Sequence, residues 1–242
     1  MNVNRNKRKE ICNCFVAYLD IMGFSRKVRE NLYSANIDLD NFLFATEFFK
    51  ENADGISLSV FSDSVFVFTK QDNVESVNNF LTYLSCLILS SFSEQIPLKG
   101  AISYGQVIID EDRNKFLGVP IIDAYKLHNK LFYFGVVIDD KAYKRIQELK
   151  QVDHYNLFRQ LTPIKPDKRD EKDIIITSIE YQLHYNLNWP LPYKPEDKKS
   201  IELLDCTNSN EAQIYKKNTL EFIEKSFEFK NTISIIRRLQ GK

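Results

Sequence analysis

The chain has 242 residues, of which 43% are hydrophobic and 27% charged, and these values are typical of a globular protein with a substantial core. Its 33 basic and 33 acidic side chains balance, so no overall field favours nucleic acid or an anionic membrane, and an anionic ligand must be bound by a local site. No apolar run approaches the ~20 residues of a membrane helix, and the polar, basic start lacks a signal-peptide core, so we expect a cytoplasmic protein.

The first half of the chain alternates strand and helix patterns. A strand at about 14–20 precedes a helical stretch, in which two helices broken near 34–38 fit the apolar spacing best. A β-hairpin, a helix and a further strand follow at about 56–69, 73–93 and 97–109. The order β-α-β-β-α-β is the split βαβ pattern of a ferredoxin-like sheet, so we expect an α+β fold whose helices cover one face.

The pattern continues beyond the fourth strand. A charged turn at 110–114 leads to a helix at about 119–133, which Gly118 opens. Val136–Ile138 is predicted to be a strand, and Asp139 is placed to cap the helix that follows it.

The last third of the chain is polar until its final segment. Exposed loops are predicted at 163–173, which is dense in charge, and at 189–200, which is rich in proline and lysine. Helical periodicity at about 210–239 predicts a helix that packs on the core or on a second subunit. The expected organisation is a flexible basic N-terminus at 1–11, a catalytic domain at 12–165 and a C-terminal extension at 166–242.

Two aspartates lie at the ends of short apolar runs. Asp20 ends the first strand, just before Gly23 and a helical pattern, and Asp63 lies in the trio Ser62-Asp63-Ser64, which predicts a tight hairpin turn. Mg²⁺ prefers oxygen ligands and is often bound by one or two carboxylates together with substrate phosphates. The pair therefore suggests a two-metal site for a nucleoside triphosphate, although either aspartate alone is more often a turn or helix-start residue.

Cysteine and histidine give no sign of a further site. The four cysteines are too few and too irregularly spaced for a disulfide framework or a zinc site, and we expect reduced thiols. The three histidines form no His-x-x-x-His pair and no serine elbow accompanies them, so a hydrolase triad is not supported and we interpret them as surface or partly packed residues. The cysteines are at positions 12, 14, 86 and 206, and the histidines at 128, 154 and 184.

Four motifs resemble, in order and spacing, those of a class III nucleotidyl cyclase domain over about 12–150. They are Asp-Ile-Met-Gly-Phe-Ser at 20–25, Ser-Asp-Ser at 62–64, Lys-Gly-Ala-Ile-Ser-Tyr-Gly at 99–105 and Gly-x-x-x-x-x-Ala at 118–124. The resemblance implies a ferredoxin-like βαββαβ class III cyclase core with C-terminal strand and helix extensions. It also implies formation of a cyclic nucleotide with loss of pyrophosphate.

The same resemblance assigns candidate site residues. It implies two Mg²⁺ or Mn²⁺ ions, and the candidate metal ligands are Asp20, Ile21 and Asp63. Backbone amides at the helix start are expected to bind the phosphate tail, and Gly23 either permits close approach of the backbone or only ends the strand. Lys99 and Lys115 are expected to approach the nucleotide. The candidate substrate-binding residues are Ile21, Met22, Gly23, Phe24, Ser25, Ser59, Lys99 and Lys115.

The sequence departs from the family at several positions. Ser59 and Lys115 replace the two residues that read a purine base, which argues against ordinary adenine or guanine selection because a polar pocket rejects a base that leaves its groups unpaired. The family's transition-state asparagine and arginine correspond to Ile122 and Lys126. Lys126 retains a positive charge without the planar fork of arginine and is either a catalytic residue, with Asp20 and Asp63, or a solvated helix residue.

These departures resemble the pyrimidine cyclases of the bacterial Pycsar antiphage systems. Gly-x-x-x-x-x-Ala-Tyr at 118–125 and Asn-Trp-Pro at 188–190 add to this resemblance. It implies conversion of UTP or CTP to the 3′,5′-cyclic nucleotide, a homodimer with active sites at its interface, and a separate effector that senses the product. No residue distinguishes uracil from cytosine.

Three other functions stay open. One is a purine cyclase with an altered pocket, and another is a catalytically inactive pseudo-cyclase that binds nucleotide. The third is a module that binds nucleic acid or a partner, because ferredoxin-like sheets often present aromatic residues to single strands. Here Phe61, Phe66 and Phe68 are expected to build core instead, so neither nucleic acid nor membrane is an expected partner.

Overall fold

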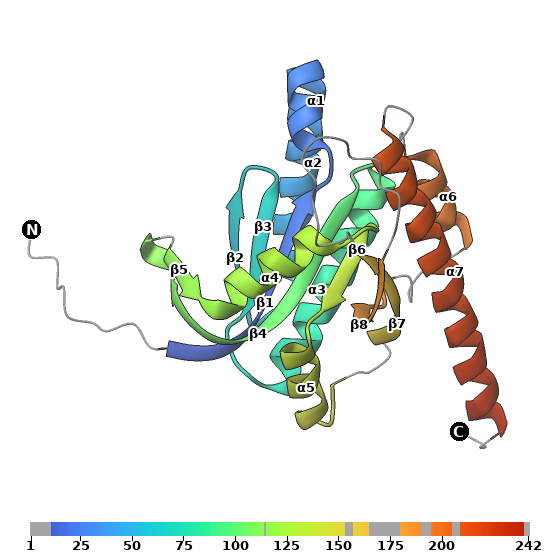
Figure 1. The fold of residues 1–242 in the computed structure, drawn as a ribbon. Helices are drawn as coiled ribbons and strands as arrows, with labels where there is room; N and C mark the ends of the chain where they lie inside the picture. Colours follow the sequence, from blue (N-terminus) through green and yellow to red (C-terminus); the bar gives the residue numbers. More distant parts are fainter. Residues whose placement is uncertain are drawn as a thin grey trace, which may run out of the picture.

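The computed structural model describes residues 11–113, 115–152, 157–164, 180–189, 195–204 and 209–239. In these ranges the strands form one sheet in the order β2-β3-β1-β4-β6-β8-β7, with β5 paired to the C-terminal end of β4, and helices lie on both sides of it (Figure 1). The strands are β1 (Ile11–Ile21), β2 (Ile56–Phe61), β3 (Ser64–Thr69), β4 (Leu98–Asp110), β5 (Lys115–Gly118), β6 (Gly135–Ile138), β7 (Leu157–Ile164) and β8 (Glu180–Leu187). The helices are α1 (Phe24–Glu30), α2 (Leu32–Glu51), α3 (Val74–Ser93), α4 (Val119–Lys130), α5 (Asp140–Glu148), α6 (Pro195–Leu203) and α7 (Asn210–Leu239), with the short 3₁₀ helix η1 (Glu111–Arg113) before β5.

The predicted βαββαβ core is confirmed. Its strands lie in the order β2-β3-β1-β4, and α2 and α3 pack on one face. Phe15 and Leu19 alternate along β1 and are fully buried with Phe42 of α2 and with Phe80 and Leu84 of α3. Successive side chains of a strand point to opposite faces, so Val16 and Tyr18 are directed to the other face of the sheet.

That second face is covered in part by α4 and β5. The buried side of α4 includes Ala124 and His128. A charged turn at 110–114 with no strand after it is predicted from the sequence, but the structure has η1 and then β5, which pairs with β4. Phe116 of β5 stacks on Phe68 of β3 with ring centroids 4.8 Å apart, and this long-range contact holds the β4–β5 hairpin over the sheet.

Asn31 separates α1 from α2, so the predicted break at 34–38 is wrong. The backbone of Asn31 is extended, and its side chain accepts a hydrogen bond from the amide of Ser34 at 3.0 Å. Asparagine is one of the strongest helix N-caps, so the second helix begins directly after it and 34–38 lies within α2.

Other predicted boundaries agree closely with the structure. The hairpin, the helix after it and the next strand correspond to β2–β3, α3 and β4. Asp139 caps α5 as predicted, because its side chain accepts a hydrogen bond from the amide of Ala142 at 2.7 Å. The helix expected to reach residue 133 ends at Lys130, since Leu131 is extended and its carbonyl accepts a hydrogen bond from the Tyr215 hydroxyl at 2.8 Å.

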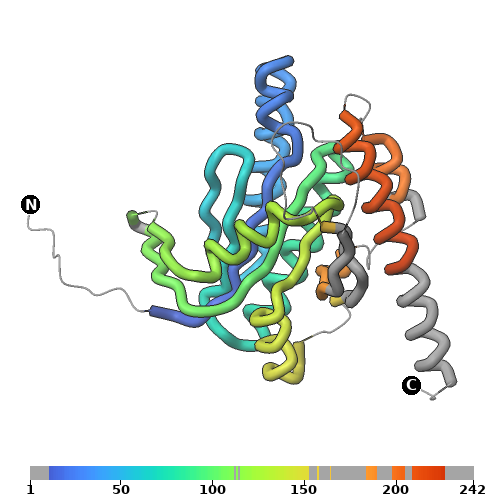
Figure 2. The backbone as a smooth tube through the Cα atoms, viewed as in Figure 1, coloured from blue at the N-terminus to red at the C-terminus, as the bar shows by residue number. Residues whose placement is uncertain are grey.

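The C-terminal part extends the same sheet. β8 pairs with β6 and along its whole length with β7, so the sheet continues across the expected boundary between 165 and 166. In Figure 2 the orange and red segments, α6 and the first half of α7, lie together beside this side of the sheet. α7 confirms the helix predicted at 210–239, and it packs on the core through Tyr215, Phe222 and Ile223.

The two predicted loops are partly wrong. Residues 163–164 end β7, while 165–173 lie outside the described residues. Trp189 is fully buried among aromatic side chains, and 195–200 form most of α6. Within the described parts of these polar segments, Ile164 and Trp189 are buried in the core.

The remaining expectations concern cysteines, termini and membranes. Cys12, Cys14 and Cys86 are free thiols, and burial raises the pKa of Cys14 and of Cys86. Residues 1–10, His154 and Cys206 lie outside the described residues. Of the helices that the structure describes, none is both long and apolar enough to cross a membrane.

Candidate active site

The topology brings the two aspartates to the same end of the sheet. Asp20 lies near the end of β1, where it pairs with Ser64 on one side and Lys99 on the other. Asp63 lies in the β2–β3 turn, and its carbonyl accepts a hydrogen bond from the Ile21 amide at 3.0 Å. Burial has the largest effect on the pKa of Asp20 and raises it, and the negative charge of Asp63 adds to this rise. A cation bound nearby would stabilise the ionised form of both carboxyl groups.

Asp20 is surrounded by three side chains, which come from β1, β3 and α4. The Ser64 hydroxyl donates to Oδ1 of Asp20 at 2.5 Å, and the Tyr18 hydroxyl lies 3.4 Å from the same oxygen and 2.9 Å from Oγ of Ser64. Nε2 of His128, on α4, lies 4.0 Å from Oδ2. We call Tyr18, Ser64 and His128 the Asp20 cradle. Its members leave the Asp20 side chain only 23% exposed.

The surroundings of Asp20 change its pKa in opposite directions. Burial raises the pKa of Asp20 above its ordinary value, and the hydrogen bond from Ser64 lowers it. Burial also raises the pKa of Tyr18 to about 12, so its phenol is protonated at neutral pH and able to donate. The carboxylate is therefore partly desolvated yet supplied with donors, a combination found at many functional sites.

The donor set fits Mg²⁺ or Mn²⁺. Asp20 precedes Ile21 directly and the backbone of Asp63 contacts it, so both aspartates lie at this point of the sheet. Mg²⁺ characteristically takes one or two carboxylates and completes its coordination with water and substrate phosphates. Across the described ranges, no group of three or more His, Cys, Asp or Glu side chains is arranged to hold a metal. The arrangement thus suits an ion that arrives with a phosphate ligand better than a closed structural zinc site.

The loop after β1 takes the sharp turn that its glycine predicts. Gly23 has φ of 79°, in the left-handed region, and a Cβ there would meet nothing within 4 Å. Glycine is therefore favoured at position 23 by the left-handed backbone of the turn and not by tight packing. The absence of a side chain leaves the backbone accessible at this end of the sheet. Phe24 is buried, whereas Ser25 is exposed and Met22 is partly buried with its amide donating to the Pro97 carbonyl at 2.9 Å.

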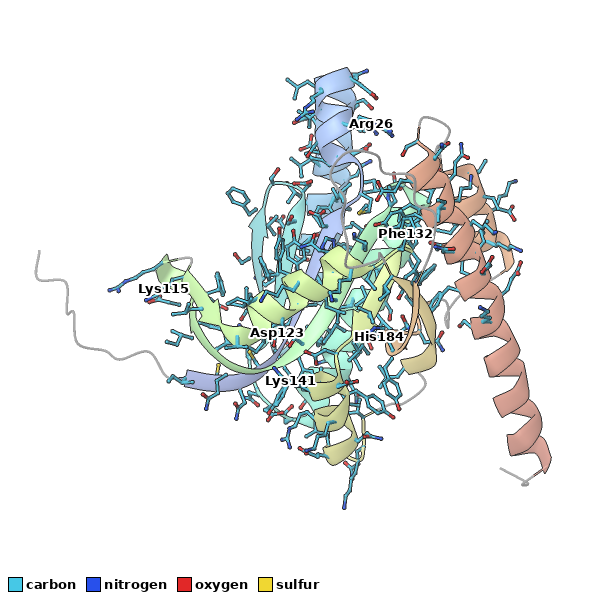
Figure 3. All side chains as sticks on the ribbon, in the orientation of Figure 1. Arg26, Lys115, Asp123, Phe132, Lys141 and His184 are labelled. Atoms are coloured by element: carbon cyan, nitrogen blue, oxygen red, sulfur yellow. The ribbon has the colours of Figure 1, made fainter. Side chains whose placement is uncertain are left out.

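The other predicted residues are spread over three elements. Lys99 lies opposite Asp20 but is only 3% exposed, and its Nζ donates to the Tyr215 hydroxyl of α7 at 3.3 Å. Lys115 begins β5 at the end of the β4–β5 hairpin and points away from the sheet in Figure 3. Lys126 and Ile122 are exposed on α4. Within one chain, the structure therefore groups Lys99 with the aspartates and leaves Lys115 and Lys126 at the surface.

A row of aromatic rings runs across the sheet from the Asp20 cradle. Tyr18 packs on Phe66 at 4.8 Å between ring centroids, Phe66 on Phe68 at 6.2 Å, and Phe68 on Phe116. Ser59 pairs with Phe66 in the β2–β3 hairpin and is partly buried. Phe61, predicted to be core, is 82% exposed instead, because it lies at the open end of β2.

Sequence reasoning missed four residues around the aspartates. Tyr18 lies two residues before Asp20 and Ser64 directly after Asp63, so strand alternation and the turn motif together contain the signal for both. His128, interpreted as an ordinary histidine, is 4% exposed beside Asp20, because α4 crosses β1. Tyr215 has no such local signal, since α7 reaches the site from the far end of the chain.

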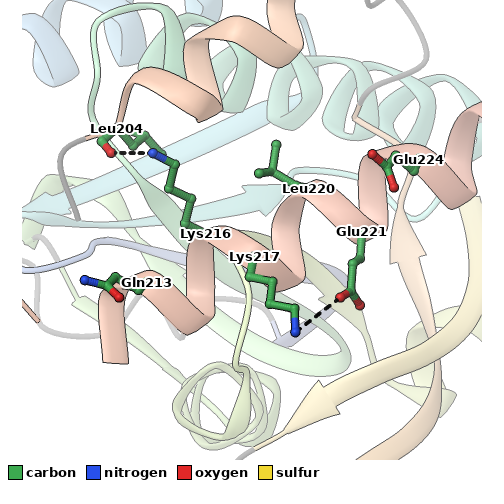
Figure 4. A pocket seen from close by; sticks show the side chains of 7 residues that line it. All are labelled: Leu204, Gln213, Lys216, Lys217, Leu220, Glu221 and Glu224. Carbon is green, nitrogen blue, oxygen red and sulfur yellow. Dashed lines mark hydrogen bonds and ion pairs between the residues drawn. The ribbon is translucent and has the colours of Figure 1, made fainter. Parts of the chain in front are cut away.

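A separate pocket lies between α6 and α7 (Figure 4). It is lined by Leu side chains and by long charged side chains such as Lys216, whose Nζ donates to the Leu204 carbonyl at 2.9 Å. None of its lining residues is a predicted site residue. Its two carboxylates, Glu221 and Glu224, form ion pairs with Lys217 and Lys198.

Comparisons with known proteins support the fold. No family model and no curated protein matches the chain. Among solved structures, it is similar to a crystallised guanylyl cyclase (TM-score 0.50, 11% identity, 74% of this chain and 93% of the other). It is also similar to a bacterial light-regulated adenylyl cyclase, with a TM-score of 0.51 and 13% identity over 81% of this chain and 99% of the other. A third similar structure is the catalytic core of a rhodopsin-guanylyl cyclase of converted specificity bound to ATPαS, with a TM-score of 0.51 and 14% identity over 74% of this chain and 97% of the other. The chain therefore has the fold of class III nucleotidyl cyclases.

Proposed function

We propose that the protein is a nucleotidyl cyclase that converts a pyrimidine nucleoside triphosphate, UTP or CTP, into its 3′,5′-cyclic nucleotide and pyrophosphate. The observation that carries the proposal is the convergence of Asp20 and Asp63 at the end of β1 in a cyclase fold, with Lys99 in register beside them. A site with two carboxylates and one buried cation matches the charge distribution of a metal-bound triphosphate.

The reaction needs the 3′-hydroxyl oxygen to attack the α-phosphorus while the bond from that phosphorus to the pyrophosphate oxygen breaks. Two Mg²⁺ or Mn²⁺ ions, when bound, supply stabilisation of the attacking and leaving oxygens. Asp20 and Asp63 would hold the ions, and the backbone near Ile21 would lie beside them. The open turn at Gly23 would receive the phosphate tail, and Lys99 would balance its charge. The hydroxyl proton leaves to solvent and pyrophosphate is released.

Pyrimidine selection is supported by the face next to Ser59. The aromatic row offers a stacking surface, which any base accepts, and Ser59 supplies one short hydroxyl where the purine cyclases carry a longer reader. Phe66 and Tyr18 fill the adjacent space, which favours a single-ring base. Because a serine hydroxyl can both donate and accept a hydrogen bond, it can pair with the polar edge of uracil or of cytosine. Both UTP and CTP are therefore proposed as substrates.

A homodimer is supported by an apolar surface on β5 and α4. Leu117, Val119, Ile122 and Tyr125 are each at least 49% exposed, although large apolar side chains are usually buried. A second copy would cover this surface and bring Lys126 of one chain toward Asp20 of the other. By resemblance to the Pycsar systems, the cyclic product would act as a second messenger in antiphage defence, read by a separate effector.

Pyrophosphate release tests the proposal. The purified protein is incubated with Mn²⁺ and each of ATP, GTP, CTP or UTP, beside Asp63→Ala, whose place in a turn outside the core predicts an intact fold. Release from UTP or CTP that the variant abolishes supports the proposal. Release from ATP or GTP alone would identify a purine cyclase, and tight nucleotide binding without release would identify a pseudo-cyclase.

The shared site has its own test. Asp20→Ala and Lys126→Ala are expected to be inactive alone and to regain activity when mixed, because one of the two sites in a mixed dimer is intact. Full activity of Lys126→Ala alone would remove Lys126 from the site.

A further inference from the structure

Lys99 is a buried cation whose position is fixed from the C-terminal helix. It pairs with Asp20 across β1 and β4, and it is only 3% exposed. Its Nζ donates to the Tyr215 hydroxyl at 3.3 Å and lies 5.3 Å from the centroid of that ring. The Tyr215 hydroxyl in turn donates to the Leu131 carbonyl at 2.8 Å. A buried charge is costly unless it is paired, so these contacts determine where the ammonium group can lie.

Tyr215 is itself held firmly. Its ring, 1% exposed, stacks on Phe134 with centroids 5.4 Å apart and meets Phe132 edge-on at 4.8 Å. Two further residues of the same α7 face bind the same segment. Asn218 donates to the Phe132 carbonyl at 2.7 Å, and Thr219 accepts from the Phe134 amide at 2.8 Å. Buried hydrogen bonds of this kind specify one arrangement of helix and segment.

The held lysine acts on the candidate metal site. Lys99 and Asp20 are direct partners in the register of β4 and β1, and side chains of directly opposed residues lie on the same face of a sheet. If the proposed function is correct, this edge binds a triphosphate, whose charge a compact ammonium stabilises only when it is correctly placed.

We propose that Tyr215 is a positioning residue for the nucleotide site: α7 fixes the Lys99 ammonium beside Asp20, which makes the C-terminal extension a part of that site. This inference rests on the proposed function for its ligand, a polyphosphate. The opposite possibility is that the contact only packs α7 on the core, and then Tyr215 contributes to stability alone.

Tyr215→Phe tests the inference because it keeps the ring and removes the hydroxyl. Loss of a hydrogen bond to a charged group corresponds to about a tenfold loss in affinity. We therefore expect about tenfold weaker binding of Mn²⁺-pyrophosphate by calorimetry, and a similar rise in KM for the triphosphate with a smaller change in kcat. The matched control is Tyr133→Phe, which removes another fully buried hydroxyl, bonded to Asn186 at 2.6 Å.

A double variant separates positioning from stability. Adding Tyr215→Phe to Lys99→Met is expected to change pyrophosphate affinity no further, because residues acting through one group are not additive. Equal affinity in wild type and Tyr215→Phe, or equal losses in Tyr215→Phe and Tyr133→Phe, would overturn the inference. Wild-type protein that binds pyrophosphate but forms no product refutes the proposed function alone, whereas protein that does neither refutes both.

Discussion

Ser64→Ala tests the Asp20 cradle most sharply. The serine hydroxyl donates a hydrogen bond of 2.5 Å to Oδ1 of Asp20, while the Tyr18 hydroxyl lies 3.4 Å from the same oxygen, near the limit of a hydrogen bond. Loss of a residue that hydrogen-bonds a metal ligand typically costs about 10–100-fold in metal affinity. Asp63 is retained and Tyr18 can shift onto the vacated oxygen, so we expect about a tenfold loss, at the lower end of that range.

The assay is titration of nucleotide-free protein with Mn²⁺, with free Mn²⁺ measured by electron paramagnetic resonance. Because the Ser64 hydrogen bond lowers the pKa of Asp20, its removal raises that pKa further. Mn²⁺ binding by the variant should therefore weaken at a higher pH than in the wild type. Ser57→Ala is the control, because it also removes a buried hydroxyl from this hairpin. That hydroxyl donates a hydrogen bond to Glu111 and not to Asp20. Unchanged Mn²⁺ affinity and pH dependence in Ser64→Ala would refute the role of the cradle.

Two further predictions concern stability. Burial raises the pKa of Asp20, so its ionised form destabilises the fold above the folded-state pKa, and wild type regains that stability as pH falls through it. Without metal at pH 8, Asp20→Asn should therefore unfold at a higher temperature than the wild type, by about 2–4 °C for each kcal/mol of destabilisation that the substitution removes. The difference should be smaller at acidic pH. A lower unfolding temperature of the variant at pH 8 would contradict this prediction. Arg145 donates to both oxygens of Asp72, at 3.0 and 3.1 Å, and Arg145→Ala should lower the free energy of unfolding by about 1–3 kcal/mol without changing pyrophosphate affinity. Lys141→Ala, which breaks an exposed ion pair with Asp123, is its control and should change stability by less than about 1 kcal/mol; an equal effect of the two variants would contradict the prediction.

The sequence predicted those parts of the candidate site whose signal is local. Alternation along β1 and the polar turn before β3 are contained within a few residues, so the strand that carries Asp20 and the turn that carries Asp63 were predicted. The pairing of β1 with β3 and β4 follows from the βαββαβ order and places Lys99 beside Asp20. These features depend on strand period and turn chemistry, which a short stretch of sequence determines.

Residues that act across long distances were not predicted. β5 depends on the contact of Phe116 with Phe68, and His128 gains its place only when α4 crosses β1. Tyr215 reaches Lys99 from a helix near the end of the chain. Packing between distant segments decides these cases, and it overrides local pattern, as in β5, which follows the charged turn where no strand was predicted.

The identity of the product tests the central claim most directly. Purified protein is incubated with UTP or CTP and Mn²⁺, beside Asp20→Ala, and the product is separated by chromatography and identified by mass spectrometry. The proposed mechanism predicts a 3′,5′-cyclic monophosphate, equal in mass to the linear monophosphate less one water, with pyrophosphate in equal amount and neither formed by Asp20→Ala. A linear mono- or diphosphate, or a cyclic product that persists in Asp20→Ala, would contradict it.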